Sequence, residues 1–215
     1  MNITQIINWL PQLLEGLEIT FSASLISIVT SIAWGCLVAS MISFGNRLLT
    51  PALRIYTSVF RNSPLLVQMF FCFYGLPYIG IKFSPLVCGV LSVTLNEGAF
   101  VAEIIRGSFR NIPHGEIEAA YSLGLSKFQV IRKVAFPLAF RTSIPMLTGQ
   151  SSIVIKDTSL LSLIMVVDIT RAGNIFYTTT FNNISFWIVA GIYIMLFLFF
   201  SHAGKYIEKK VMVKR

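Results

Sequence analysis

The chain has 215 residues, of which 55% are apolar and 12% carry a charge, and its mean hydropathy is +0.75. This composition excludes an ordinary soluble globular protein and predicts a chain that lies in a lipid bilayer. The net charge of +8 needs no nucleic-acid partner, because basic residues at the ends of membrane spans would contact the anionic headgroups of membrane lipid.

The first long apolar segment, Ile19 to Gly45, contains no charged residue. A helix needs about 20 apolar residues to cross the hydrocarbon core of a bilayer, so we predict a first span over residues 17–45. The segment is too long for a removable signal peptide, and it lacks the basic start and the small-residue cleavage site of one. The mature chain is therefore expected to begin near Met1.

Four more apolar segments follow, and we predict spans over residues 55–81, 85–106, 138–167 and 182–204. Pro77 should kink or end the helix of the second span. Lys156 and Asp157 interrupt the fourth apolar segment, so we expect that span to be broken. The simplest interpretation is a single all-α membrane domain with five transmembrane helices over the whole chain.

The distribution of lysine and arginine predicts the orientation, because these residues are retained on the cytoplasmic side of a membrane. If the amino terminus lies outside, the cytoplasmic segments hold 14 of the 17 basic residues. They are Arg47, Arg54, Arg61, Arg106, Arg110, Lys127, Arg132, Lys133, Arg141, Lys205, Lys209, Lys210, Lys214 and Arg215. Only Lys82, Lys156 and Arg171 then remain outside. We therefore predict an outside amino terminus and a cytoplasmic carboxyl terminus.

A charged segment, residues 107–137, lies between the third and fourth predicted spans and should be cytoplasmic. Its first part predicts a short helix. Pro113 suits the first turn of a helix, and Glu116 and Glu118 lie where carboxylates stabilise the positive end of the helix dipole. Gly124 can adopt the left-handed conformation that ends a helix.

A second short helix is predicted after Gly124. Ser126 and Gln129 have the spacing of a capping box, which starts a helix. This helix should run from Lys127 to Val134 and stop near Pro137, because proline disrupts a helix interior. The segment is thus predicted to form two short helices hinged at Gly124.

Two functions fit this helix pair equally well from spacing alone. The small residues Ala119 and Ala120 would let the first helix approach another surface closely, and Glu118 would offer a carboxylate to that surface. The second helix would present a basic face, which consists of Lys127, Arg132 and Lys133. Alternatively, the pair could be an amphipathic hairpin that lies on the membrane.

Several stretches resemble one known family. Glu118-Ala119-Ala120, Gly124 and Pro137 have the spacing of the EAA loop of the membrane subunits of bacterial ABC importers. Further stretches resemble the polar amino acid permeases of that family, the histidine, arginine and glutamine permease-like branch. They are GLEIT at Gly16 to Thr20, RNSPLLVQ at Arg61 to Gln68, YGLP at Tyr74 to Pro77, LNEGAFVAEIIRG at Leu95 to Gly107 and KDTSL at Lys156 to Leu160.

The resemblance implies a type I ABC importer permease fold with five transmembrane helices and a cytoplasmic coupling-helix loop, in the inner membrane of a bacterium. It implies two ATP-binding subunits that hold ATP and Mg, a second permease subunit that is identical or a sister chain, an extracytoplasmic solute-binding protein, and a polar amino acid as substrate. Glu118, Ala119, Ala120 and Gly124 would couple the ATPase to transport, as a two-state joint biased by nucleotide. No cofactor is expected on this chain.

The chain departs from the family pattern at three places. Glu97 stands where the family usually has a small or hydroxyl residue, Leu138-Ala139 where it usually has Gln-Ala, and Gly149-Gln150 where it usually has Gly-Asn. These departures put the identity of the amino acid in doubt. Glu97 would favour a cationic substrate such as arginine or histidine.

Ionisable residues inside a span are candidates for functional sites, because an unpaired charge there costs at least about 2.5 kcal/mol. Helical spacing places Asn96 and Glu103 on one stripe of the third span and Glu97 about 100 degrees away. Glu103 and Arg106 are three residues apart and can form a structural ion pair. Glu97 lies nearer mid-span and either faces the substrate path or is structural.

The fourth span offers a similar choice. Lys156 and Asp157 either pair at the outer interface or, with the hydroxyls of Thr158 and Ser159, mark a broken helix at a substrate site. Gln68 in the second span is ambiguous in the same way. The candidate residues of the substrate path are therefore Asn96, Glu97, Gln68, Thr158 and Ser159.

The sequence contains no pattern for an enzyme or a metal site. Cys36, Cys72 and Cys88 are expected to be packing residues, and His114 and His202 to be surface or interfacial residues. Because there is also no phosphate-binding loop, zinc-type motif or nucleophile elbow, ATP hydrolysis would belong to a separate chain.

The alternative function is an ion- or proton-coupled secondary amino acid transporter. In that case Glu97, Glu103 and Asp157 would carry protons or ions without a nucleotide partner. The hinged cytoplasmic helix pair has no use in such a carrier, and five spans without an internal repeat are atypical of one. The importer is therefore the preferred prediction.

Overall fold

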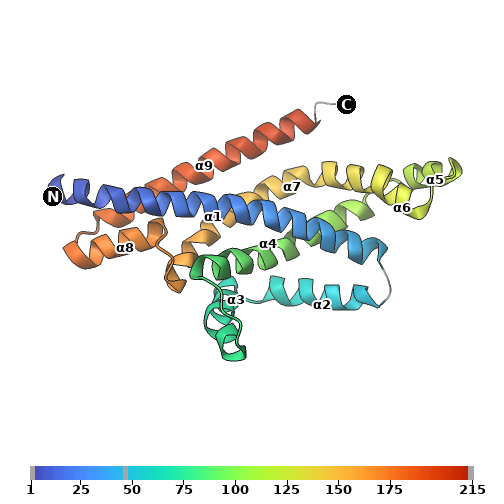
Figure 1. Cartoon of the computed structure of the whole chain (residues 1–215). Coiled ribbons are helices and arrows are strands. Elements are labelled where there is room, and N and C mark those ends of the chain that lie inside the picture. The colour runs from blue at the N-terminus through green and yellow to red at the C-terminus, as the bar shows by residue number, and fades with distance from the viewer. Residues whose placement is uncertain (1–2, 46–47, 213–215) are drawn as a thin grey trace. The chain divides into compact units, whose positions relative to one another are not determined.

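The computed structural model describes residues 3–45 and 48–212, and every regular element within these ranges is helical (Figure 1). This confirms the all-α fold class. Arg47, Lys214 and Arg215, which contributed to the orientation prediction, lie outside the described residues. The elements in chain order are α1 (Ile3–Phe44), α2 (Leu49–Asn62), α3 (Leu65–Phe70), the π turn η1 (Phe71–Gly75), the 3-10 turn η2 (Leu76–Ile79), α4 (Pro85–Arg110), α5 (His114–Ser122), α6 (Lys127–Val130), the π turn η3 (Ile131–Ala135), α7 (Phe136–Asp157), the 3-10 helix η4 (Thr158–Ile164), α8 (Ile169–Thr180) and α9 (Ile184–Met212).

Helix α1 begins much earlier than the predicted first span. It starts at Ile3 and continues through Pro11. Trp9 is buried in this extension, packs against Phe176 of α8 with ring centroids 4.6 Å apart and the rings tilted by 34°, and donates its indole N–H to the Ala172 carbonyl at 3.0 Å. The extra turns of α1 are thus held by packing against a distant segment of the chain, which is a stronger influence than local propensity.

The second predicted span is not one helix. Helix α2 ends at Asn62, and Ser63 is extended with ψ 145° because the following Pro64 disfavours the helical region for the residue before it. Helix α3 then changes into the π turn η1 and into the 3-10 turn η2, which contains Pro77 and ends at the left-handed Gly80. The continuous span expected over 55–81 is therefore replaced by two helical segments joined at Ser63 and Pro64.

Three helices are long and apolar enough to cross a membrane within the described part of the chain. They are Gln5–Phe44, Pro85–Arg110 and Ile184–Val211. They correspond to the first, third and fifth predicted spans. The count of five crossings stays a prediction, because the second and fourth predicted spans are interrupted.

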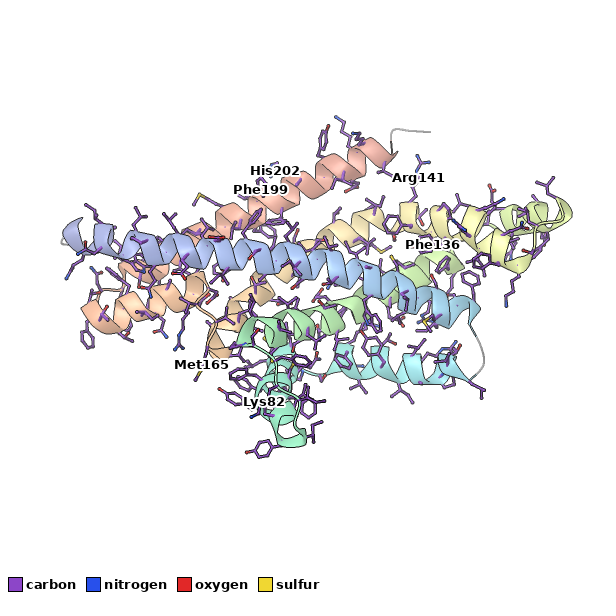
Figure 2. The ribbon with its side chains drawn as sticks, in the orientation of Figure 1. Lys82, Phe136, Arg141, Met165, Phe199 and His202 are labelled. Atoms are coloured by element: carbon purple, nitrogen blue, oxygen red, sulfur yellow. The ribbon has the colours of Figure 1, made fainter. Side chains whose placement is uncertain are left out.

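The fourth predicted span is interrupted later than the sequence suggested. Lys156 and Asp157 still belong to the last turn of α7, and the change to the 3-10 helix η4 comes at Thr158. Met165, labelled in Figure 2, ends η4 in the left-handed conformation with φ 67°. A bulky residue adopts this conformation only where the surroundings enforce it.

One compact unit comprises the chain up to Val29 together with Pro64–Thr94 and Ser151–His202. Its buried side chains form two clusters. One includes Cys72, Cys88 and Leu161, and the other brings Trp9 of α1 together with residues of α8 and α9. Both cysteines are free thiols within the apolar core, as expected for packing residues.

The other compact unit comprises Thr30–Ser63, Leu95–Gln150 and the chain from Ala203 onward. Its core packs α1 against α4, and two glycines allow the close approach. A methyl group at Gly98 would lie 2.7 Å from the Trp34 ring, and one at Gly35 would overlap the Val101 side chain. Small residues at such positions let membrane helices pack closely.

Candidate functional site

The predicted cytoplasmic segment contains the hairpin that we call the α5–α6 hairpin, residues His114–Ala135. Pro113 precedes α5 as its N-cap rather than occupying the first turn. At the other end, Leu125 N–H donates to the Ala120 carbonyl at 3.3 Å and Gly124 N–H to the Tyr121 carbonyl at 2.9 Å. This is a Schellman motif, and it requires the left-handed Gly124, whose φ is 76°. The predicted end of the first helix is confirmed.

The start of the second helix is also confirmed. The Ser126 side chain accepts from Gln129 N–H, and the Gln129 side chain accepts from Ser126 N–H, so both halves of the capping box form. The predicted stop near Pro137 is wrong. The helix continues through the π turn η3 into α7, with Pro137 in the first turn of α7. A π turn widens the helix just before the proline, where the missing N–H and the ring would otherwise disrupt it.

The two alanines of the hairpin have different environments. Ala119 is exposed, as is Glu118, whereas Ala120 is only 4% exposed, and Val130 of α6 is buried as well. The small side chain of Ala120 therefore serves the close packing of α5 on α6 and η3, which contact it. The close approach that Ala120 permits is thus within the hairpin, and the role of Ala119 and Ala120 in coupling stays a prediction.

The hairpin exposes large apolar side chains that the sequence reasoning missed. Leu123 is 81% exposed and Phe128 is 69% exposed, and Tyr121 is about half exposed. Lys127, Arg132 and Lys133 are exposed on the same hairpin. The signal in the sequence was the occurrence of isolated apolar residues in a charged segment. Where exposed apolar side chains form a contiguous patch they mark a contact with another macromolecule or a membrane, so the hairpin is a candidate contact surface.

Both candidate polar residues in the middle of α4 are buried and hydrogen-bonded. The Asn96 side-chain amide donates to the Phe60 carbonyl at 2.7 Å. Glu97 is 2% exposed and accepts a hydrogen bond from the Gln150 side chain at 2.7 Å. Glu97 and Gln150 are two of the three departures from the family pattern, and the structure brings them together. Buried polar groups are satisfied in this way as a rule.

A small ionic cluster lies near the C-terminal end of α4. Arg106 binds the Glu103 carboxylate through both Nε and Nη2, and Arg61 of α2 lies 3.8 Å from the same carboxylate. Thr57 donates a long hydrogen bond of 3.5 Å to it. Arg61 also lies over the Phe100 ring at 5.2 Å. The structure therefore places Glu103 with Arg106, and it adds Arg61, which is too far away in sequence to be recognised from spacing.

The remaining candidates for the substrate path lie in the other compact unit. Thr158 is buried, donates to the Ile155 carbonyl at 2.7 Å and lies 3.4 Å from the Ser24 hydroxyl. Ser159 donates to the Lys156 carbonyl at 2.7 Å, and Gln68 is half-buried on α3. Both hydroxyls therefore satisfy backbone carbonyls where α7 becomes η4.

The Lys156 side chain makes a cation–π contact with an aromatic ring of α9. Its ammonium group lies 4.8 Å from the centre of the Phe197 ring. A pair between Lys156 and Asp157 stays a prediction. So does the assignment of all five polar residues to one path, because Asn96 and Glu97 belong to one compact unit and Gln68, Thr158 and Ser159 to the other.

Within residues 3–45 and 48–212, no group of three or more His, Cys, Asp or Glu side chains could hold a metal ion. His114 and His202 are both exposed. His202, labelled on α9 in Figure 2, lies with Nδ1 2.7 Å from the Leu198 carbonyl one turn earlier. Neither histidine is therefore part of a metal centre among the described residues.

Comparison with known proteins gives consistent matches along the chain. The family model described as the inner membrane component of binding-protein-dependent transport systems matches residues 3–213. The chain is 32% identical to the putative glutamine transport system permease protein GlnP of Rickettsia felis, over 97% of this chain and 98% of that protein. It is 34% identical to the nopaline transport system permease protein NocM of Agrobacterium fabrum, over 93% and 87% of the two chains.

A solved structure agrees with these relatives. The fold superposes with a TM-score of 0.87 on a crystal structure of an amino acid ABC transporter with histidines, at 27% identity and over 98% of this chain and 99% of that one. The family match covers nearly the whole sequence, and it includes both the α5–α6 hairpin and the polar residues of α4. The chain therefore belongs to the family of inner membrane components of binding-protein-dependent transport systems.

Proposed function

We propose that this chain is the membrane-spanning permease subunit of an ATP-driven importer, which moves a polar amino acid across the bacterial cytoplasmic membrane. Family membership supports the transport role. The names of the relatives support an amino acid or a related compound, since one is a putative glutamine permease and another a nopaline permease. Because these substrates differ, the relatives leave the individual substrate of this chain open.

The observation that carries the proposal is the surface of the α5–α6 hairpin. Exposed Leu123 and Phe128 lie close in sequence to the exposed carboxylate of Glu118. An apolar centre with charges around it is typical of an interface between proteins. The hairpin exposes charges of both signs, Glu116 and Glu118 on α5 and three basic residues after Ser126, and such a mixed pattern suits a protein partner better than a uniformly anionic lipid surface. The surface therefore favours docking on a partner protein, and the proposed partner is a cytoplasmic ATPase subunit.

The geometry suggests how the hairpin would act. Its first helix is held to its second by the Schellman motif at Gly124 and by the packing of α5 against α6 and η3, in which Ala120 and Val130 are buried. The second helix is continuous with α7 through η3. Closure of two ATPase subunits around ATP and Mg would shift the docked hairpin, and the shift would pass directly into α7. Such a unit biases two conformations of the transporter.

The remaining parts of the proposal follow from the family and from the charge distribution. The amino terminus lies outside, the chain crosses the membrane five times, and a second permease subunit, identical or a sister chain, completes the path. A solute-binding protein delivers the amino acid from outside. ATP hydrolysis takes place on the ATPase chains, so this chain is not itself an enzyme. The family match favours this function over the ion- or proton-coupled secondary transporter.

The test is affinity purification of the tagged chain from its native membrane in mild detergent, with identification of every co-purifying chain. We expect a separate ATP-binding subunit, with or without a second permease. Replacing Leu123 and Phe128 by serine should reduce its recovery by about tenfold, because buried apolar anchors dominate interfaces. Replacing Leu48 and Leu49, exposed apolar residues between the first two predicted spans, by serine is the matched control. A lone oligomer of this chain that persists under crosslinking would favour the secondary transporter instead.

A further inference from the structure

A basic groove in the unit that contains Thr30–Ser63 and Leu95–Gln150 has no part in the function proposed above. It has a volume of about 290 Å³ and is formed by the end of α1, by α2 and by the last turns of α4. Three guanidinium groups line it, from Arg54, Arg106 and Arg110, and its lining includes no carboxylate. The volume is near the lower end of about 300–1,000 Å³ that is usual for ligand pockets.

The positive charge of the groove is mostly uncompensated. Arg54 and Arg110 are exposed, and neither forms an ion pair with a carboxylate in the described part of the chain. Arg106 uses Nε and Nη2 to bind Glu103, which fixes its planar group in place. An arginine offers five donors in a rigid fork that suits phosphate oxygens, so a fixed guanidinium can still contribute to binding an anion.

Aromatic rings form one wall of the groove. Phe44 and Phe109 line it, and their rings meet edge to face with centroids 5.0 Å apart. Phe109 in turn lies 6.3 Å from Phe136, which Figure 2 labels at the start of α7. The groove therefore combines cationic donors with an apolar wall, which is a combination suited to a ligand with a charged head and an apolar body.

The position of the groove along the helices is equally informative. Two of the candidate membrane spans, Gln5–Phe44 and Pro85–Arg110, end at residues that line the groove. The spans predicted from the sequence, residues 17–45 and 85–106, end near the same residues, so the proposed topology places the groove at the level of the lipid headgroups. The proposed orientation of the chain places this level at the cytoplasmic leaflet, whose anionic lipids attract basic residues near a span.

We propose that this groove binds the phosphate group of an anionic phospholipid. Arg54 and Arg110 contact the phosphate, Arg106 adds a donor positioned by Glu103, and the rings of Phe44 and Phe109 contact the glycerol and the first part of an acyl chain. Inorganic phosphate shares the charged part of this chemistry, but it would leave the aromatic wall without a partner. The lipid is therefore the occupant that uses the whole groove.

The test uses the purified transporter with all of its subunits, after removal of bound lipid by detergent exchange. Native mass spectrometry would measure binding of phosphatidylglycerol and of phosphatidylcholine with the same acyl chains. The variant is Arg54→Gln with Arg110→Gln. The matched control is Lys209→Gln with Lys210→Gln, which removes the same charge from exposed positions near the end of α9.

We expect wild type to prefer phosphatidylglycerol, and the groove variant to bind it about tenfold more weakly or worse, since each basic residue near an anionic lipid contributes roughly a factor of five. The control should weaken binding clearly less than the groove variant, because Lys209 and Lys210 attract anionic lipid only as screened surface charges, without the groove's aromatic residues. Millimolar inorganic phosphate should displace no lipid. All four side chains are exposed, so neither variant should alter folding, and an unchanged melting temperature checks this.

Three results would overturn the proposal. Equal weakening in both double variants would mean that binding reflects overall charge rather than a groove. Displacement of the lipid by inorganic phosphate would identify a site for a soluble anion. Unchanged lipid binding in the groove variant together with loss of a co-purifying subunit would make the groove a protein contact. Arg54→Lys with Arg110→Lys, which keeps the charge, should retain most of the affinity and provides a second measurement should the glutamine variant fail to assemble.

Discussion

The α5–α6 hairpin and helix α4 use carboxylates in opposite ways. Glu116 and Glu118 of the hairpin are exposed, and neither forms an ion pair within the described residues. On α4, Glu97 is hydrogen-bonded to Gln150, and Glu103 is bound by Arg106. A carboxylate that the fold leaves exposed beside apolar side chains is available to another chain. A carboxylate that the fold buries and satisfies stabilises the subunit itself.

The largest effect should come from reversing the charge of an exposed carboxylate on the hairpin. Replacing Glu118 by lysine should lower coupled uptake about a hundredfold, because a like-charge contact in an interface costs several kcal/mol. The measurement is substrate uptake in proteoliposomes with ATP inside. The amount of inserted subunit and its melting temperature should stay unchanged, because the side chain is exposed.

Glu116→Lys is the matched variant for this comparison, since Glu116 is also exposed and lies two residues closer to the start of α5, on a different face of the helix. A smaller loss of uptake in Glu116→Lys would place the partner's contact at Glu118. Normal ATP-coupled uptake in Glu118→Lys would show that Glu118 has no part in coupling. The exposed carboxylates of the hairpin would then differ from those of α4 in exposure but not in function.

The second effect concerns the stability of the subunit rather than its activity. Replacing Glu103 by glutamine leaves Arg106 and Arg61 without their carboxylate. Loss of one partner of a buried ion pair costs about 3–5 kcal/mol, and the 20% exposure of the Glu103 side chain reduces the expected loss to about 2 kcal/mol. Thermal unfolding of the purified protein in detergent should show this as a lower melting temperature.

Arg61→Gln provides the control for that measurement, because Arg61 is more exposed and lies 3.8 Å from Glu103. It should cost less than about 1 kcal/mol, as exposed ion pairs do. If Arg61→Gln destabilised the protein as much as Glu103→Gln, the contact between Arg61 and Glu103 would account for most of the stability that the Glu103 carboxylate contributes.

The smallest effect is expected for Glu97→Gln. A glutamine can still accept the hydrogen bond from Gln150, so the stability change should be under about 1 kcal/mol. Because Glu97 is buried, we expect uptake of a cationic and of a neutral amino acid to change equally. Competition assays with arginine and glutamine would measure this. A selective loss of the cationic substrate would instead place Glu97 on the substrate path and identify it as a specificity determinant.

The features of this protein that could be predicted from sequence depend on contacts between near neighbours. Gly124 predicts where α5 ends, and Ser126 with Gln129 predicts where α6 begins. Both predictions are possible because the hydrogen bonds of each motif join residues only a few positions apart. Glu103 and Arg106 are one turn apart and form the expected pair. These predictions needed no knowledge of the rest of the fold.

The features that sequence reasoning missed depend on distant contacts. The bond between Glu97 and Gln150 joins residues 53 positions apart, and no periodic pattern contains that information. Trp9 extends α1 toward the amino terminus by packing against Phe176, which lies in another part of the chain. The burial of Ala120 depends on α6 and η3, which pack against α5. Tertiary packing overrides local preference in each of these cases.

The π turn η3 gives the hairpin a fixed register relative to α7. It contains one more residue per turn than an α-helix, and the helical path runs unbroken from Lys127 to Asp157. Deleting one residue between Ile131 and Ala135 would convert the π turn into ordinary α-helix and rotate the hairpin by about 100 degrees around the axis of α7. The exposed side chains would then face a different direction although no contact residue had changed. The extra residue therefore determines the direction in which the subunit presents the proposed docking surface of the hairpin.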